Sequence, residues 1–287
     1  MSEEVSGGGI GVFKLFLGLI VFIVLTALTQ IGGIVFVVSA LLVSWFLGAR
    51  HWNFLLRWIT HLIAFAVLYA AVTVAAVPPL AREFGRHPLP CLPAANRPYG
   101  AVHPALCILN RHYASSSAHR VLSALTKEMN AQFSGTTVLY LDAGFPFLDG
   151  FPMLPHLLHD DGRSVDLAFF YTNARGVYQR GRTRSPFGYW AFEPPRKGDP
   201  RPCFQDKGLG LRWDLGFLQK YWRPYKLDEK RTAAMVRWLV TEGPNFGVQR
   251  VYLEPHLVNR FQIASPFLRF QGCRSERHDD HIQIKLR

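Results

Sequence analysis

The stretch LFLGLIVFIVLTALTQIGGIVFVVSALLVSWFLGA, residues 15–49, contains no charged side chain. A single helix over this stretch would be roughly 50 Å long, whereas the hydrocarbon core of a bilayer is about 30 Å thick. Polar side chains and paired glycines at residues 29–33 are typical of a tight turn at the membrane surface. The stretch therefore predicts two membrane-spanning helices, at about residues 12–29 and 34–48.

A third apolar run, at residues 58–77, has the length of another span. Pro78 and Pro79 follow it and are expected to end the helix where the chain leaves the bilayer. Residues 1–78 therefore form a predicted membrane region with three spans, and the lipid bilayer is one expected partner.

The loop between the second and third predicted spans carries Arg50, His51 and Arg57. Because positively charged loops favour the cytoplasmic side, this loop and the N-terminus are expected in the cytoplasm and the C-terminal domain outside it. The protein would then be a multi-pass protein of the cytoplasmic membrane with an extracytoplasmic domain. A cleaved signal peptide at residues 1–30 is the alternative, but two early glutamates and the lack of a small-residue cleavage site count against it.

The excess of basic residues gives a formal net charge of +12. This charge suits a polyanionic neighbour, such as anionic lipid headgroups or an acidic cell-wall polymer, although a plain solvated basic surface is equally compatible with it. The sequence has no run of five basic residues and no recognisable nucleic-acid-binding motif, so nucleic acid is not an expected partner.

All four cysteines follow the apolar region, and none forms a close pair of the C-x-x-C type. An even number on one side of a membrane permits disulfides if that side is oxidising. Pairing of Cys91 with Cys107 and of Cys203 with Cys273 is one of three possible connectivities.

The remainder of the chain divides into a Pro- and Arg-rich tether at residues 79–110 and a globular domain at 111–287. Apolar periodicity predicts a helix that starts near Ser115 and ends before Gly135, and a second one capped by Asp228 that runs to Thr241. Short β-branched and aromatic runs predict strands at residues 136–141, 165–171, 249–253 and 281–286. The domain is therefore predicted to be α+β.

Two short stretches gather potential metal ligands. PHLLHDDGRSVD contains His156, His159 and Asp166, and RHDDHIQIKL contains His278 and His281. If the last strand runs beside the strand of Asp166, His281 and Gln283 share one face of it, because alternate residues of a strand point the same way. The ordinary alternative is that each histidine is a surface residue or a satisfied core residue.

These motifs resemble those of the penicillin-insensitive murein endopeptidases, zinc metallopeptidases of the superfamily that also holds lysostaphin, D-Ala-D-Ala peptidases and the hedgehog signalling domain. In that family an H-x-x-H-x-x-G-x-x-x-D segment follows a Gly-rich loop. Here it reads His156, His159, Gly162 and Asp166 after GFPFLDG at residues 144–150. QRVYLEP at 249–255 resembles the next family strand, and the closing H-x-x-H-x-H strand reads His278, His281 and Gln283.

The resemblance implies a small antiparallel-sheet metallopeptidase-like domain with a zinc ion. His159 and Asp166 would be zinc ligands, His281 the active-site histidine beside the metal, and His156 a residue of the groove. Gln283 stands where the third protein ligand is expected, and a neutral amide is a weaker zinc ligand than imidazole. The alternative is that His281 or His278 supplies the third ligand instead, at the cost of a general base.

Two functional hypotheses follow from the resemblance. The first is a zinc peptidase that cleaves peptidoglycan cross-links outside the cytoplasmic membrane. The second is a non-catalytic domain that binds the wall or a partner and keeps the peptidase fold after losing its metal with Gln283. A different zinc chemistry and a membrane assembly factor are further alternatives. The loop at residues 175–202 is either a lid over the groove or a plain surface excursion.

Overall fold

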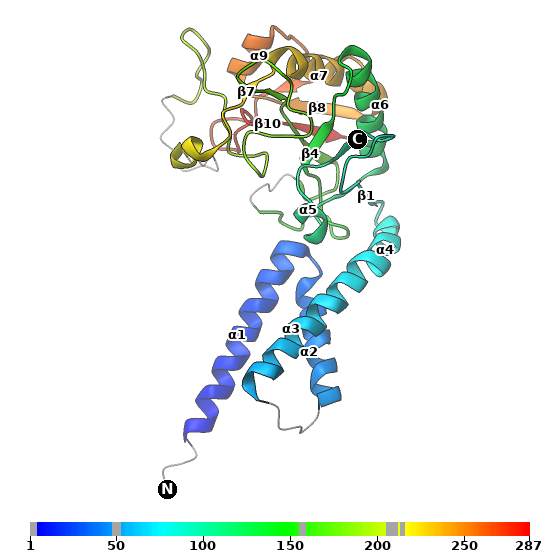
Figure 1. Ribbon diagram of the computed structural model, residues 1–287, viewed down its shortest axis with the longest axis vertical. Helices are drawn as coiled ribbons and strands as arrows, with labels where there is room; N and C mark the ends of the chain where they lie inside the picture. The colour runs from blue at the N-terminus through cyan, green and yellow to red at the C-terminus, as the bar shows by residue number, and fades with distance from the viewer. Residues whose placement is uncertain (1–4, 48–52, 155–158, 205–211, 213–215) are drawn as a thin grey trace.

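The computed structural model describes residues 5–47, 53–154, 159–204, 212 and 216–287. Three apolar helices project from one side of an α+β domain (Figure 1). They are α1 (Val5–Thr29), α2 (Gly32–Leu47) and α3 (Phe54–Ala71). Helix α2 contacts both α1 and α3. The predicted α+β class is confirmed.

Two helical segments are long and apolar enough to cross a membrane, Val12–Thr29 and Phe54–Glu83. The apolar part of α2, Gly32–Phe46, is shorter than a full span. The predicted break between the first two helices is present, and Gln30 adopts a positive φ of 66° there. Gly33 has no room for a side chain, because a Cβ would lie within 2.6 Å of the carbonyl oxygen of Phe22. This glycine therefore allows α2 to lie close against α1.

The prediction that Pro78 and Pro79 end the third helix is wrong. Helix α3 continues through a π-helical segment, η1 (Val72–Ala76), into α4 (Val77–Glu83), so both prolines lie inside a continuous helix. The Val77 N–H donates to the carbonyl of Val72, five residues back. Proline lacks an N–H and its ring clashes with the carbonyl four residues earlier, and a wider π turn just before the prolines is one way to relieve this conflict.

The domain is built on a six-stranded sheet with the order β2-β4-β5-β10-β8-β9. The central strands β4, β5, β10 and β8 are antiparallel, while β2 pairs with β4 and β9 with β8 in parallel. The strands are β2 (Tyr99–Ala101), β4 (Val138–Asp142), β5 (Ser164–Ala168), β8 (Val248–Tyr252), β9 (Leu268–Arg269) and β10 (His281–Leu286). The four predicted strands are therefore present, with ends shifted by up to three residues.

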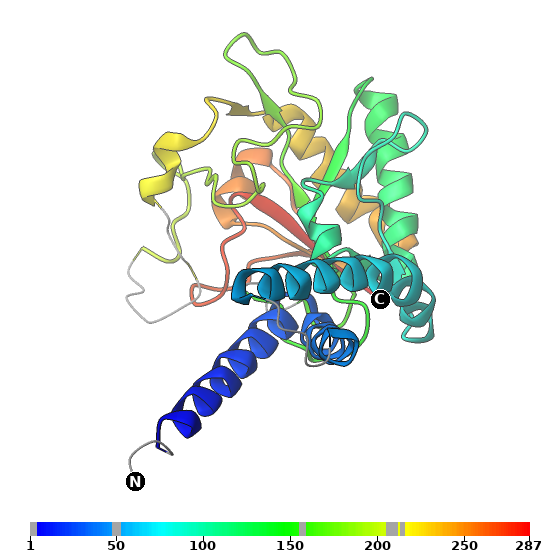
Figure 2. The ribbon, with the colours of Figure 1, turned by 60° about the horizontal axis from the view of Figure 1, so that its bottom comes forward.

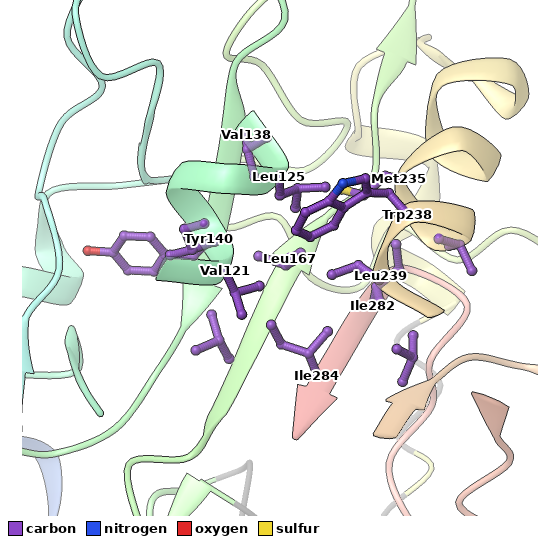
Figure 3. Packing of buried hydrophobic residues seen from close by; sticks show 14 of the residues in the cluster. Val121, Leu125, Val138, Tyr140, Leu167, Met235, Trp238, Leu239, Ile282 and Ile284 are labelled. Atoms are coloured by element: carbon purple, nitrogen blue, oxygen red, sulfur yellow. The ribbon is translucent and has the colours of Figure 1, made fainter. Parts of the chain in front are cut away.

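Two helices cover one face of this sheet, α6 (Ser116–Gln132) and α7 (Glu229–Thr241) (Figures 2 and 3). Alternate residues of β5 and β10, such as Leu167, Ile282 and Ile284, point into the core beneath them. Burial of these apolar side chains provides the main stabilisation of the domain. The residues between them in sequence, Asp166 and Gln283, must point to the opposite face.

Part of the predicted tether belongs to the domain. Residues 79–110 contribute the end of α4, the short strand β1 (His87–Pro88), β2 of the main sheet and α5 (Ala105–Ile108). The pairing of β2 with β4 means that the folded domain begins before the predicted boundary at residue 111. A polar, Pro-rich composition gave no indication of this short edge strand.

Several short elements connect the helices and strands described above. They are β3 (Tyr113–Ala114), β6 (Tyr171–Thr172), η3 (Gly216–Tyr221), β7 (Lys226–Leu227), α8 (Gly243–Phe246) and α9 (Pro255–Phe261). The disulfides Cys91–Cys107 and Cys203–Cys273 match the pairing named from the sequence.

Candidate functional site

The candidate site lies on the sheet face opposite α6 and α7. Asp166 of β5 and Gln283 of β10 are direct partners in the antiparallel ladder, and His281 lies two residues before Gln283 on the same face. The predicted convergence of these two distant stretches is therefore present. His159, Asp166, His278, His281 and Gln283 are all buried, with 0–2% of each residue exposed.

His159 reaches this face from the loop before β5. Its Nδ1 lies 2.6 Å from the carbonyl oxygen of Ala143, and its Nε2 lies 3.0 Å from Oδ1 of Asp166. A carbonyl can only accept a hydrogen bond, so Nδ1 carries a proton and Nε2 faces the carboxylate. Imidazoles that bind metals are commonly held in this way, by a backbone carbonyl on the other ring nitrogen.

Gln283 joins the two histidine stretches. Its Nε2 lies 2.9 Å from Nε2 of His159, and its Oε1 lies 3.2 Å from Nε2 of His278. In this orientation the amide donates to a neutral His159 and accepts from His278. Rotation of the amide by 180° would present Oε1 to His159 instead, which suits an imidazolium or a bound cation.

His281 has two carboxylates as neighbours. Its Nδ1 lies 2.5 Å from Oδ1 of Asp280, and its Nε2 lies 3.7 Å from Oδ2 of Asp166. Burial lowers the pKa of His281, but the charges of Asp166 and Asp280 outweigh this effect and raise the pKa to about 9. For His159, burial likewise lowers the pKa, and the Asp166 carboxylate again leaves it raised. The site therefore favours positive charge, either as protons on imidazole or as a cation.

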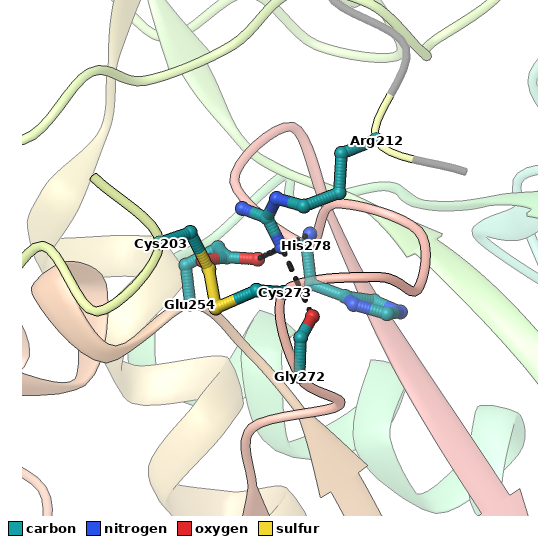
Figure 4. The surroundings of a disulfide bond; sticks show 6 residues. All are labelled: Cys203, Arg212, Glu254, Gly272, Cys273 and His278. Carbon is teal, nitrogen blue, oxygen red and sulfur yellow. Dashed lines mark hydrogen bonds and ion pairs between the residues drawn. A yellow bond between two sulfur atoms is a disulfide. The ribbon is translucent and has the colours of Figure 1, made fainter. Parts of the chain in front are cut away.

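His278 lies beside His281, with ring centroids 5.0 Å apart. Its backbone N–H donates to Oε1 of Glu254 (3.3 Å), which also accepts from Arg212 (3.0 Å). Figure 4 shows this group next to the Cys203–Cys273 disulfide. The His278 ring is thus held beside the site, and its Nε2 contacts the Gln283 amide.

The loop at residues 175–202 covers the site. Tyr189 donates its hydroxyl proton to Oδ2 of Asp166 (2.6 Å), and its ring lies edge-on to His281 at 5.0 Å. The backbone N–H of Trp190 donates to Oδ2 of Asp280 (2.5 Å). Burial and the Asp166 charge raise the pKa of Tyr189 well above its usual range, so the hydroxyl stays a donor. Tyr189 and Trp190 of this loop therefore pack against the candidate site, so the loop is more than a plain surface excursion.

Sequence reasoning missed Tyr189 and a buried ion pair between Arg111 and Asp142. Arg111 donates to both carboxylate oxygens of Asp142 (2.8 and 2.5 Å) and to the carbonyl of Leu154 (2.8 Å). Asp142 ends the apolar strand β4, and a charged residue at the end of a buried strand is the sequence feature that could have drawn attention to it. No motif connects Tyr189 or Arg111 to the site.

Arg86 is a further residue that the sequence did not indicate. It follows α4, is buried, and donates to the carbonyl of Phe145 (2.6 Å) and to the carboxylate of Asp149. Its side chain also lies against Gly162, which has a positive φ of 66° and where a Cβ would meet the guanidinium group. Arg86 therefore joins the two loops that flank His159.

Zinc bound by imidazole and carboxylate at about 2.0–2.2 Å in a tetrahedron separates its ligand atoms by about 3.3 Å. Nε2 of His159 and Oδ1 of Asp166 are 3.0 Å apart, close to that separation, while Nε2 of His281 lies 3.7 Å from the other carboxylate oxygen, Oδ2. The His159 imidazole, the Asp166 carboxylate and a Gln283 amide that can rotate form a donor set that fits zinc, with His281 beside it. Predicted His156 lies outside the described residues.

A second group of donor atoms occurs among the described residues. Cys91, Cys107 and His112 bring one ligand atom each within 4.8 Å of one another. Because both thiols form a disulfide, only the imidazole remains as a donor there.

No protein-family model matches the sequence, and no curated protein matches it either. The candidate site brings together four residues that the sequence predicted: His159, Asp166, His281 and Gln283. His278 lies beside them.

Proposed function

We propose that the chain is a membrane-anchored zinc metallopeptidase-like enzyme that acts on peptide cross-links of peptidoglycan outside the cytoplasmic membrane. One observation carries the proposal: a loop and two neighbouring strands bring His159, Asp166 and His281 to one buried point. Imidazole and carboxylate are side chains that zinc prefers, and a buried cluster of titratable groups with perturbed pKa values is a candidate functional site.

The arrangement of the apolar helices supports the anchoring part of the proposal. Two helical segments have the length and composition of membrane spans, and they project from the same side of the domain (Figure 1). Arg57 lies in the first turn of α3, at the end of that helix far from the domain (Figure 1), and Arg50 precedes it in the sequence. By the positive-inside rule, these charges support an orientation with the domain outside the cytoplasm.

A bound zinc ion would supply a water of lowered pKa and would polarise the scissile carbonyl. His159 and Asp166 would hold the ion, with the Ala143 carbonyl fixing the ring of His159 and the Tyr189 hydroxyl fixing the carboxylate. His281, paired with Asp280, holds a proton that it can give to the leaving amine. Tyr189 and Trp190 exclude water from the same point.

The net charge of +12 supports an anionic substrate. A basic surface raises the local concentration of an acidic wall polymer and speeds its encounter with the domain. This effect needs no specific contact.

Gln283 supports a second candidate, a non-catalytic domain that binds the wall or a partner. Its amide lies against His159, at a position where the resemblance expects a third imidazole ligand. In that case the hydrogen-bonded residues would be a structural remnant of a metal site, and the groove would retain binding alone.

Digestion of purified wall fragments distinguishes the enzyme from the binding domain. Full-length protein in detergent, supplied with zinc, is expected to release cross-linked peptides, and His281→Ala is expected to slow release about 100-fold or more. His103→Ala is the matched control, because His103 is exposed and far from the site in sequence, and it should leave the rate unchanged. Wall binding without any release would reject the enzyme and favour the binding domain.

A further inference from the structure

The domain meets the apolar helices well before those helices end. The hydroxyl of Tyr69, in α3, donates to the carbonyl of Ile108 in α5 (2.6 Å), and Asn110 donates to the same hydroxyl (3.0 Å). Beyond this level the helix still exposes large apolar side chains, including Val74 and Leu80, each more than half exposed. The apolar surface of the helix therefore continues past the first contact with the domain.

The domain exposes apolar side chains at the same level. Phe84, Ile108 and Leu148 are 53%, 62% and 56% exposed, and together they are called the apolar rim here. The rim residues come from three separate segments of the chain, the end of α4, α5 and the loop after β4. In Figure 1, α5 lies between the helices and the rest of the domain.

Direct contacts fix Leu148 and Phe84 near the ends of the helices. The backbone N–H of Phe147 donates to Oε1 of Gln30, in the turn between α1 and α2 (2.9 Å). The ring of Phe147 packs against that of Phe84, with centroids 5.3 Å apart. Helix α1 has 25 residues, about 37 Å at 1.5 Å per residue, so a membrane-spanning α1 brings its terminal turn to the bilayer surface.

We propose that the apolar rim is seated in the interface of the lipid bilayer, so that the domain itself contacts lipid. The proposal rests on the membrane anchoring in the proposed function. A lipid surface is the occupant that fits, because hydrogen bonds hold Ile108 of the rim against the anchoring helix and hold the loop of Leu148 against the turn of α1 and α2. Val74 and Leu80 leave further apolar surface exposed on that helix. The loop that carries Leu148 also contains Phe145 and Asp149, the partners of Arg86, so the site loops would face the membrane surface.

Depth-dependent quenching tests this proposal on the full chain. The four native cysteines form two disulfides, so an introduced cysteine is the only thiol available for an environment-sensitive fluorophore. Ile108→Cys and Leu148→Cys report on the rim, and both sites are exposed enough to accept the label. The protein is reconstituted into vesicles of phosphatidylcholine and phosphatidylglycerol, with and without lipids that carry a nitroxide near the headgroup end of the acyl chain.

Two further labelled variants are controls. Val67→Cys lies in α3 before the contact at Tyr69 and is 64% exposed, so it reports on the anchor alone. Val177→Cys lies far from the rim, next to Tyr178, whose hydroxyl contacts Thr137 at the start of β4. The labels at 108 and 148 are expected to lose fluorescence nearly as strongly as the label at 67, while the label at 177 keeps it. Unquenched labels at 108 and 148 beside a quenched label at 67 would overturn the rim and leave the anchor intact. An unquenched label at 67 would overturn the anchor and the rim together.

Discussion

Gln283 occupies the position on which the chemistry of the site depends. It pairs with Asp166 across the ladder, and its amide contacts both His159 and His278. The amide can donate or accept at His159, but it binds zinc weakly through its oxygen alone. The affinity of the site for a zinc ion therefore depends on this residue.

Gln283→His is expected to tighten zinc retention. Mutation of a residue that only hydrogen-bonds to a metal ligand typically changes metal affinity 10–100-fold. Replacing the amide itself by a better ligand should therefore tighten zinc binding by roughly tenfold or more. Competition with a chelator, on the full-length protein in detergent, measures the change. Equal retention in both proteins would mean that residue 283 does not reach the metal.

Single residues of the site were predictable where a motif named them. The spacing of His159 and Asp166 and the alternation of His281 and Gln283 follow from one loop and two strands, which sequence describes well. Tyr189 and Arg86 were missed because they reach the site from segments far away along the chain. Only the folded packing places those side chains there.

Among the elements, hydrophobic runs predicted the helices and strands well, but the proline pair led to a wrong prediction of where the third helix ends. A proline pair predicts the end of a helix, yet the π turn at Val72–Ala76 lets the helix continue to Glu83. Short strands such as β2 were also missed, since two or three residues carry no periodic pattern.

The two disulfides should stabilise the domain to different degrees. Cys91–Cys107 spans 16 residues of separation and Cys203–Cys273 spans 70. Loop-closure entropy predicts a loss of about 3 kcal/mol for Cys91→Ser with Cys107→Ser, and of about 4 kcal/mol for Cys203→Ser with Cys273→Ser. Denaturant unfolding of the two double variants, each against the wild type, measures both losses. A larger loss for the shorter loop would contradict the entropic account.

For the whole molecule, the division into apolar helices and an α+β domain was predictable from the distribution of charge. The contact between them was not. Tyr69 joins α3 to α5, while Gln30 and Arg86 join the helical region to the loop after β4, through hydrogen bonds that no local sequence pattern encodes. The apolar helices and the loops of the candidate site are therefore connected directly by hydrogen bonds.

The zinc content of the purified full-length protein tests the central claim most directly. We expect about one zinc per chain, lost in His159→Ala and kept in His103→Ala, because His159 and Asp166 supply the two strong ligands. Zinc that survives His159→Ala would mean that the ion is held elsewhere and would contradict the assignment of the site. A wild-type protein that binds no zinc, even when zinc is supplied, would contradict the account.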